Sequence, residues 1–171
     1  DTAKEIESSV KLTDEEKAAI AAGSNIYVSL VINNEVKSEE KELVEKNLSS
    51  LVENGNIGQI FDISIIKKIG DGEAVSAQVN REVTLQIAVP EELLNKDSSI
   101  ERTYKIIRVH NGELTALDSD KCQFNENTGV ITFNTDKFST YAIVYIDKVK
   151  EVIPGGSQAG GKDNTDNGND A

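Results

Sequence analysis

The sequence predicts a mainly β protein, a two-sheet β-sandwich with two short helical insertions in its first half. Apolar and polar residues alternate over several short segments, which is the period of a strand with one face buried. Gly, Asn, Asp and Pro separate these segments at short intervals, a spacing typical of sandwiches. Both segments with strong helix signals lie before residue 56, so we expect the helices to be insertions in a β framework.

The composition allows one core built from aliphatic side chains. The 171 residues are 37% hydrophobic but only 5% aromatic, so Ile, Val and Leu must fill most of the interior. Cys122 is the only cysteine, which excludes an internal disulfide. The sequence contains no Met, so we expect the chain to be an excised or processed fragment.

The net charge of −12 bears on the partners that the protein can have. An acidic surface repels phosphate backbones and anionic membrane surfaces, so we expect no nucleic-acid partner. No apolar run approaches the roughly 20 residues of a membrane-spanning helix, so we expect no membrane insertion. The same charge keeps copies of the protein apart, and we expect a monomer.

The chain divides into three predicted regions. Residues 1–10 are polar and are predicted to be a lead-in segment, residues 11–148 the sandwich module, and residues 149–171 a flexible Gly/Asn/Asp-rich linker or tail. From Pro154 onward there is no Leu, Ile, Val or aromatic side chain. Such a segment buries too little apolar surface to offset the entropy of ordering it.

The first half of the module contains both helices. Thr13 and Glu16 have capping-box spacing and Gly23 suits a helix end, so we expect a helix at about 14–22. The apolar alternation in residues 25–33 predicts a strand with one face well buried.

Ser38 is the expected cap of a second helix, which has an apolar stripe and ends near Gly55. Residues 57–69 are rich in isoleucine, which favours a strand, and Gly70 and Gly72 close it with a turn.

The second half is predicted to be almost entirely strand. Asn111 and Gly112 form the preferred pair for a tight type I′ hairpin turn. Pro90 ends a strand, one helical turn is expected at 91–95, and Phe138 marks a corner before the last strand. The strands are expected at 73–79, 83–89, 104–110, 113–117, 130–133 and 140–147, with a short segment around Cys122 and Phe124.

Five of these segments occur in a characteristic order, namely Ile60–Ile63, Val83–Pro90, Tyr104–Gly112, Gly129–Phe133 and Phe138–Tyr145. In this order they resemble modules in cell-surface proteins of Firmicutes, of a Clostridia-like kind, and distantly the bacterial ZU5-type β-sandwiches. The resemblance covers most of residues 11–147 and implies a module that precedes a polar linker and a wall-attachment signal. No Leu-Pro-x-Thr-Gly motif is present, and the resemblance brings no catalytic residues.

No set of residues predicts a catalytic, cofactor-binding or metal-binding site. His110 is the only histidine and is expected to be a solvated residue beside the hairpin turn, because no nucleophile or orienting partner is identifiable. Cys122 is expected to be a small buried hydrophobe, although a Cys122–His110 pair is the nucleophilic alternative. Most lysines fall at predicted strand ends or on polar faces, so we expect no Lys–Asn or Lys–Asp crosslink.

Three further kinds of candidate site can be read from the sequence. Acidic loops have the oxygen ligands that calcium prefers but lack EF-hand spacing, and we expect ordinary turn and linker charge. The acidic pairs Glu91–Glu92 and Asp118–Asp120 are the alternative for acid–base hydrolysis, but adjacency alone does not create the required geometry. Most aromatics lie in core patterns, with Tyr27 and Tyr104 the two candidates for an exposed glycan platform. The acidic loop residues are Asp71, Glu73, Asp118, Asp120, Asp163, Asp166 and Asp170.

These observations predict a non-catalytic structural, spacer or interaction module of a secreted or cell-surface multidomain protein from a Gram-positive bacterium. Its expected partners are the neighbouring domains of the same polypeptide. The alternative is an adhesin-like or carbohydrate-binding module that binds a glycan or host protein through its loops.

Overall fold

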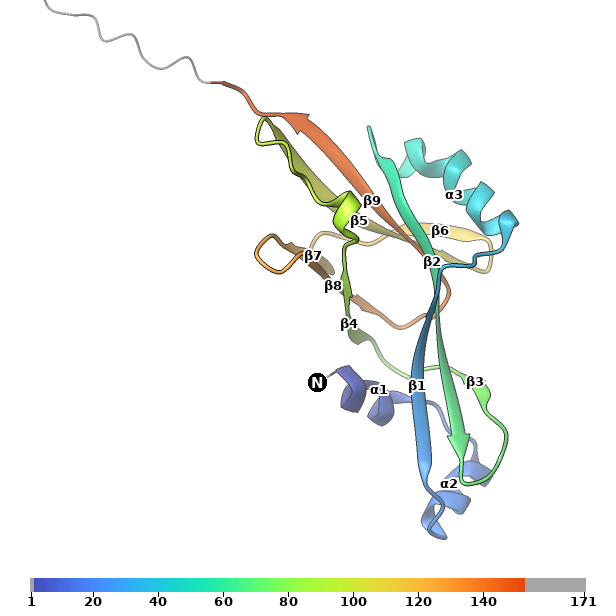
Figure 1. Cartoon of the computed structure of the whole chain (residues 1–171). Coiled ribbons are helices and arrows are strands. Elements are labelled where there is room, and N and C mark those ends of the chain that lie inside the picture. The colour runs from blue at the N-terminus through green and yellow to red at the C-terminus, as the bar shows by residue number, and fades with distance from the viewer. Residues whose placement is uncertain (1, 153–171) are drawn as a thin grey trace, which may run out of the picture.

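The structure, a computed structural model, describes residues 2–152 and consists of two sheets and three α-helices (Figure 1). The predicted mainly β, two-sheet sandwich with helical insertions is therefore confirmed. Most of the predicted linker, from residue 153 onward, lies outside the described residues. The helices are α1 (Thr2–Ser9), α2 (Asp14–Ala21) and α3 (Ser38–Leu51), with a 3₁₀ turn, η1 (Glu91–Leu93). The strands are β1 (Ile26–Asn33), β2 (Asn56–Ile69), β3 (Val75–Ala77), β4 (Val83–Ala88), β5 (Ile100–His110), β6 (Glu113–Ala116), β7 (Cys122–Asn125), β8 (Val130–Thr135) and β9 (Thr140–Val149).

The long strand β2 pairs with β9 along its first half and with β1 along its second half, so it belongs to both parts of the larger sheet. This six-stranded sheet has the order β1-β2-β9-β5-β6, and β3 also pairs with β2. The first half of β2 pairs with β9, and residues 62–69 pair with β1. We call β1, β3, α2 and residues 62–69 of β2 the arm, which extends away from the smaller sheet (Figure 1).

The main core lies between the two sheets. The smaller sheet has the order β4-β8-β7, and its Leu85, Ile131 and Phe133 are at most 1% exposed. They pack in one cluster with Phe61 and Tyr141 of the larger sheet. The strand alternation that was read from the sequence thus directs one face of each sheet into this core.

Helix α3 covers the opposite face of the larger sheet. Its Val44 and Leu48 pack against Ala142 and Val144 of β9. Consequently β9 is covered on both faces, and Tyr141–Val144 are completely buried. The expectation that the last strand is buried on at least one side is met on both.

Several local signals give the structures that were expected. The Thr13 and Glu16 capping box is present at the start of α2, and Gly23 follows the helix with φ of 105°. Asn111 and Gly112 both have positive φ, 52° and 78°, as a type I′ hairpin turn requires. These features depend only on neighbouring residues.

Three expectations differ from the structure. Ser38 is the first residue of α3 rather than its cap, because Lys37 occupies the cap position and makes no side-chain hydrogen bond there. Within the predicted lead-in, Thr2–Ser9 form α1, which presents Ile6 to the core. Strand β1 does not have a well-buried face, since Leu30 and Ile32 of its inward-facing set are 37% and 49% exposed.

The last strand is preceded by a hydrogen-bonded corner of the kind found in β-sandwiches. The Tyr141 hydroxyl donates to the carbonyl of Lys137 and lies 2.6 Å from the Thr135 hydroxyl oxygen. The Thr135 hydroxyl also accepts from the Lys137 amide at 3.2 Å. Burial raises the pKa of Tyr141 to about 12. Hydrogen bonds of Tyr141 thus stabilise the corner that was predicted around Phe138.

Candidate functional site

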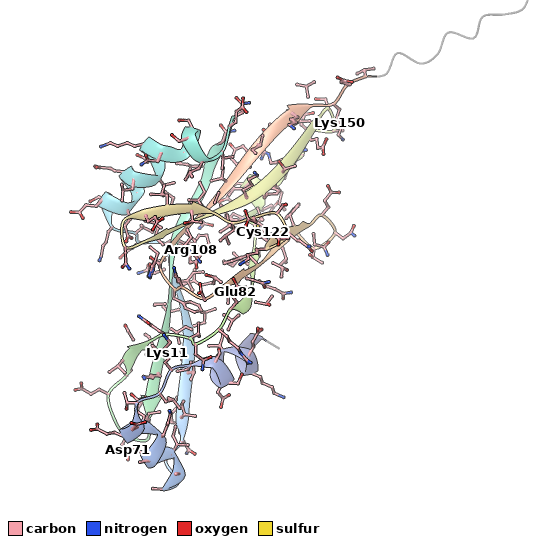
Figure 2. All side chains as sticks on the ribbon, turned by 180° about the vertical axis from the view of Figure 1, so that it is seen from behind. Lys11, Asp71, Glu82, Arg108, Cys122 and Lys150 are labelled. Carbon is pink, nitrogen blue, oxygen red and sulfur yellow. The ribbon has the colours of Figure 1, made fainter. Side chains whose placement is uncertain are left out.

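A polar groove of about 440 Å³ lies between the arm and the corner before β9. We call it the His110 groove. Hydroxyl side chains of β2 and β3 and amide side chains of residues 78–80 form one wall, and the 136–138 corner forms the other. Lys11, labelled in Figure 2, lines the groove where the arm meets the rest of the molecule.

His110 lies in this groove without a partner that would make it a catalytic base. Within the described residues, its imidazole makes no hydrogen bond or ion pair with a serine, cysteine or carboxylate. Asp136, the groove's carboxylate, lies 3.6 Å from the Arg108 guanidinium instead. A general base needs an orienting group and a nucleophile within hydrogen-bond distance. The groove presents polar groups that can bind a ligand but are not arranged for proton transfer.

The structure does not bring Cys122 and His110 together. Cys122 is in β7 of the smaller sheet, half-buried and packed against the main core, whereas His110 ends β5 of the larger sheet. Burial raises the pKa of the Cys122 thiol to about 11. Because the thiolate is the nucleophilic form, this thiol is poorly reactive at neutral pH.

The acidic pairs do not converge on a common point. Glu91 on η1 forms an exposed ion pair with Lys96 at 3.2 Å. Asp118 and Asp120 both precede Lys121, whose ammonium lies 2.6 Å from Glu82. Residues 2–152 contain no cluster of three or more His, Cys, Asp or Glu side chains suited to a metal ion. Asp163, Asp166 and Asp170 lie outside the described residues.

The two tyrosines proposed as glycan platforms have different environments. Tyr104 is 9% exposed, with its ring centroid 4.3 Å from that of Phe124 and its hydroxyl donating to the Leu93 carbonyl at 2.7 Å. It is therefore a core residue. Tyr27 is 55% exposed on β1, but it lies on the outer part of the arm and does not line the His110 groove.

Arg102 lines a second groove, of about 480 Å³, and forms an ion pair with Asp147. The guanidinium binds both carboxylate oxygens of Asp147, at 2.7 and 2.8 Å, and lies 4.2 Å from the ring centroid of Tyr145. Its Nη1 also donates to the Leu93 carbonyl at 2.9 Å. The hydrogen bonds with Arg102 lower the pKa of Asp147. These donors and acceptors are used within the protein, so the cluster positions η1 against the sheet.

Lys67 lies near the end of β2, and its side chain is buried. Its ammonium pairs with Glu16 at 2.7 Å and donates to the Lys11 carbonyl at 2.9 Å. The sequence carried a signal for this burial, since Lys67 has the same strand parity as Ile63 and Ile65.

The described residues thus form a two-sheet β-sandwich with polar grooves on its surface. No protein-family model, curated protein or solved structure matches the chain. None of the helices in the described part of the chain is long and apolar enough to cross a membrane.

Proposed function

We propose that the protein is a non-catalytic structural module that spaces or supports neighbouring domains of the same polypeptide, in an extracellular cell-surface protein of a Gram-positive bacterium. The observation that carries this proposal is the position of β9. This last strand lies between β2 and β5 and pairs with both. A spacer has to transmit tension through the chain without unfolding, and a central strand is the attachment that does this best.

The ladders on β9 are loaded in shear by a pull along the chain. Strand β9 pairs with β5 from Thr140 opposite Val109 to Val149 opposite Ile100, and the other side pairs with the first half of β2. The Lys150 amide also donates to the Ser99 carbonyl at 2.9 Å. A force applied beyond Lys150 along the strand axis acts on these hydrogen bonds together, whereas an edge strand peels away one bond at a time.

Other observations support the non-catalytic and extracellular parts of the proposal. The imidazole of His110 has no orienting partner among the described residues, and the pKa of Cys122 is about 11. The net charge of −12 favours a hydrated protein that does not bind nucleic acid. The resemblance to Firmicutes surface modules supports the location.

The test is single-molecule force spectroscopy with two attachment geometries. In the first, the protein is pulled from its N-terminal and C-terminal ends. In the second, it is pulled between the C-terminal end and a cysteine introduced as Ser99→Cys in a Cys122→Ala background, which unzips β5 from β9. We expect the main unfolding event to need a clearly higher force in the first geometry. Equal forces, or turnover of a glycosidic, peptide or ester substrate by the purified protein, would overturn the proposal.

The second candidate is an adhesin-like or carbohydrate-binding module, and the His110 groove favours it. Gln78 and Asn80 line this groove together with Ser64 and Ser76. Amide and hydroxyl groups pair well with sugar hydroxyls. The test is a glycan and host-protein array with Gln78→Ala, and with exposed Gln123→Ala as the matched control. A saturable signal lost only in Gln78→Ala supports this candidate, and the absence of any saturable signal eliminates it.

A further inference from the structure

Strand β1 has a free edge along its full length. It is the terminal strand of the larger sheet, and β2 is the only strand in the described residues that pairs with it. Tyr27, Leu30, Val31 and Ile32 are 55, 37, 37 and 49% exposed. A run of exposed apolar side chains on both faces of an edge strand marks a site for strand pairing.

The backbone of this edge is oriented for a further strand. The Gly70 amide donates to the Asn25 carbonyl at 2.8 Å, so odd-numbered residues turn their N–H and C=O groups toward β2. The Ile63 amide, opposite Ile32, donates away from β1 to the Ser139 carbonyl at 2.9 Å. This agrees with the alternation of backbone groups along β1. Even-numbered residues therefore point their backbone groups outward, namely Ile26, Val28, Leu30 and Ile32.

The edge lacks the devices that usually prevent pairing. Exposed edge strands are commonly protected by charged residues, proline or a bulge. Residues 18–34 contain no charged side chain and no proline, although 28% of the chain is charged. The pairing of β1 with β2 runs from Ile26 to Asn33 without a shift of register. Residues 154–171 are an unsuitable occupant, because their Gly, Asn, Asp and Pro content disfavours strands.

We infer that this edge binds β1 of a second copy of the chain, antiparallel, to form a two-fold symmetric dimer with one continuous sheet. Antiparallel pairing of identical strands is self-complementary, as an isologous interface requires. The two-fold axis is perpendicular to the sheet and keeps each side chain on its own face. Each residue must therefore lie opposite one of the same parity.

Two central registers satisfy this condition, and the cross-strand side-chain pairs favour one of them. An axis at Leu30 places Tyr27 opposite Asn33 and Ser29 opposite Val31, which pairs polar with apolar groups. An axis at Ser29 pairs like with like, which is the favourable arrangement of cross-strand neighbours. Its pairs are Val28 with Leu30, Tyr27 with Val31, Ile26 with Ile32, Asn25 with Asn33, and Ser29 with itself.

The dimer is weak, and salt strengthens it. Each copy contributes the edge of one strand, which is small beside the roughly 1,200–2,000 Å² of a standard stable interface. Each copy also has a net charge of −12, so repulsion opposes association until salt screens it. The monomer expected from the charge is therefore the state at low concentration and low salt.

The first test places like charges on the symmetry axis. Ser29 is exposed, so Ser29→Glu and Ser29→Lys leave the core intact. We expect sedimentation equilibrium to show a concentration-dependent dimer for the unaltered chain. For either variant alone, the dimerisation affinity should be at least tenfold weaker. A one-to-one mixture of the two variants restores dimerisation, because Glu and Lys then face each other. Thr115→Glu, on the opposite edge of the same sheet, is the control and leaves dimerisation unchanged.

A second test measures the register by crosslinking. In a Cys122→Ala background, Ser29→Cys puts two thiols opposite each other, with Cα atoms about 4.5 Å apart, which suits a disulfide. Val31→Cys is equally accessible, but its two copies lie four residues apart, about 13 Å along the strands. Mild oxidation should give covalent dimer with Ser29→Cys only. A chain that stays monomeric at all concentrations, or crosslinks equally at both positions, overturns the inference.

Discussion

The ammonium of Lys67 lies 2.7 Å from a carboxylate oxygen of Glu16 and joins the end of β2 to the first turn of α2. The side chains of Lys67 and Glu16 are 9% and 21% exposed. Lys67 also donates to the Lys11 carbonyl, so one side chain fastens both the helix and the segment before it. The attachment of α2 to the arm depends on this contact, because α2 itself buries no residue.

The stability of the protein should therefore depend on the ionisation of Glu16. The hydrogen bond from Lys67 lowers the pKa of Glu16 below its ordinary value of 4.5, against the opposing effect of partial burial. A lowered pKa in the folded state stabilises the protein fully above the unfolded value, and this contribution is lost as the pH falls through the folded value. We expect Glu16→Gln to be less stable than the unaltered chain at neutral pH, and the difference to shrink below pH 4.5. Urea unfolding of both proteins at neutral pH and below pH 4.5 measures this difference in stability.

Glu15→Gln is the matched control for this prediction. Glu15 is the adjacent, exposed residue of the same helix and makes no ion pair in the described residues. Its substitution should leave the pH dependence unchanged. If Glu15→Gln and Glu16→Gln had the same pH profile, the Lys67 contact would not be the cause.

The Tyr141 hydroxyl should stabilise the corner before β9. Tyr141→Phe keeps the ring in the core but removes the donor to Lys137 and the contact with Thr135. We expect a loss of about 1–2 kcal/mol in the free energy of unfolding, since the buried Thr135 hydroxyl loses a partner. Tyr27→Phe makes the same chemical change at an exposed site and should cost nearly nothing. Equal effects at the two positions would contradict a structural role for the corner.

The hairpin and the capping box were predictable because neighbouring residues determine them. The turn at Asn111 and Gly112 needs only two residues with positive φ. The burial of β1 was not predictable, because it depends on what packs over the strand. Its alternation does direct Val28 toward the core, but within residues 2–152 Leu30 and Ile32 stay 37% and 49% exposed.

For the candidate site, too, the sequence predicted residue types but not long-range positions. It indicated His110 and Cys122 as candidates, but not that they lie in separate sheets. Long-range contacts such as Arg102 with Asp147 have no local signature, since the two residues lie 45 positions apart. Helix α1 had a weak signal in the spacing of Ile6 and Val10, which are four residues apart and both buried.

The Cys122 thiol should react slowly in the folded protein. Burial raises its pKa to about 11 from an ordinary 9.0. At pH 8 the thiolate fraction falls by about a hundredfold, because the pKa rises by about two units. We expect iodoacetamide to alkylate the native protein about a hundredfold more slowly than the urea-unfolded chain. Similar rates would mean that the thiol is open to solvent in the folded state.

Truncation after β9 and truncation before β9 should have different effects on stability. Residues 154–171 contain no large apolar side chain and lie outside the described residues, so a chain that ends at residue 153 should keep its melting temperature within about 2 °C. A chain that ends at Ser139 lacks the strand between β2 and β5, and with it the fully buried Tyr141 and Ile143. It should not fold, as circular dichroism will show by the loss of a cooperative thermal transition. A large fall in melting temperature on removing residues 154–171 alone would mean that these residues dock on the domain, which would contradict their assignment as a linker.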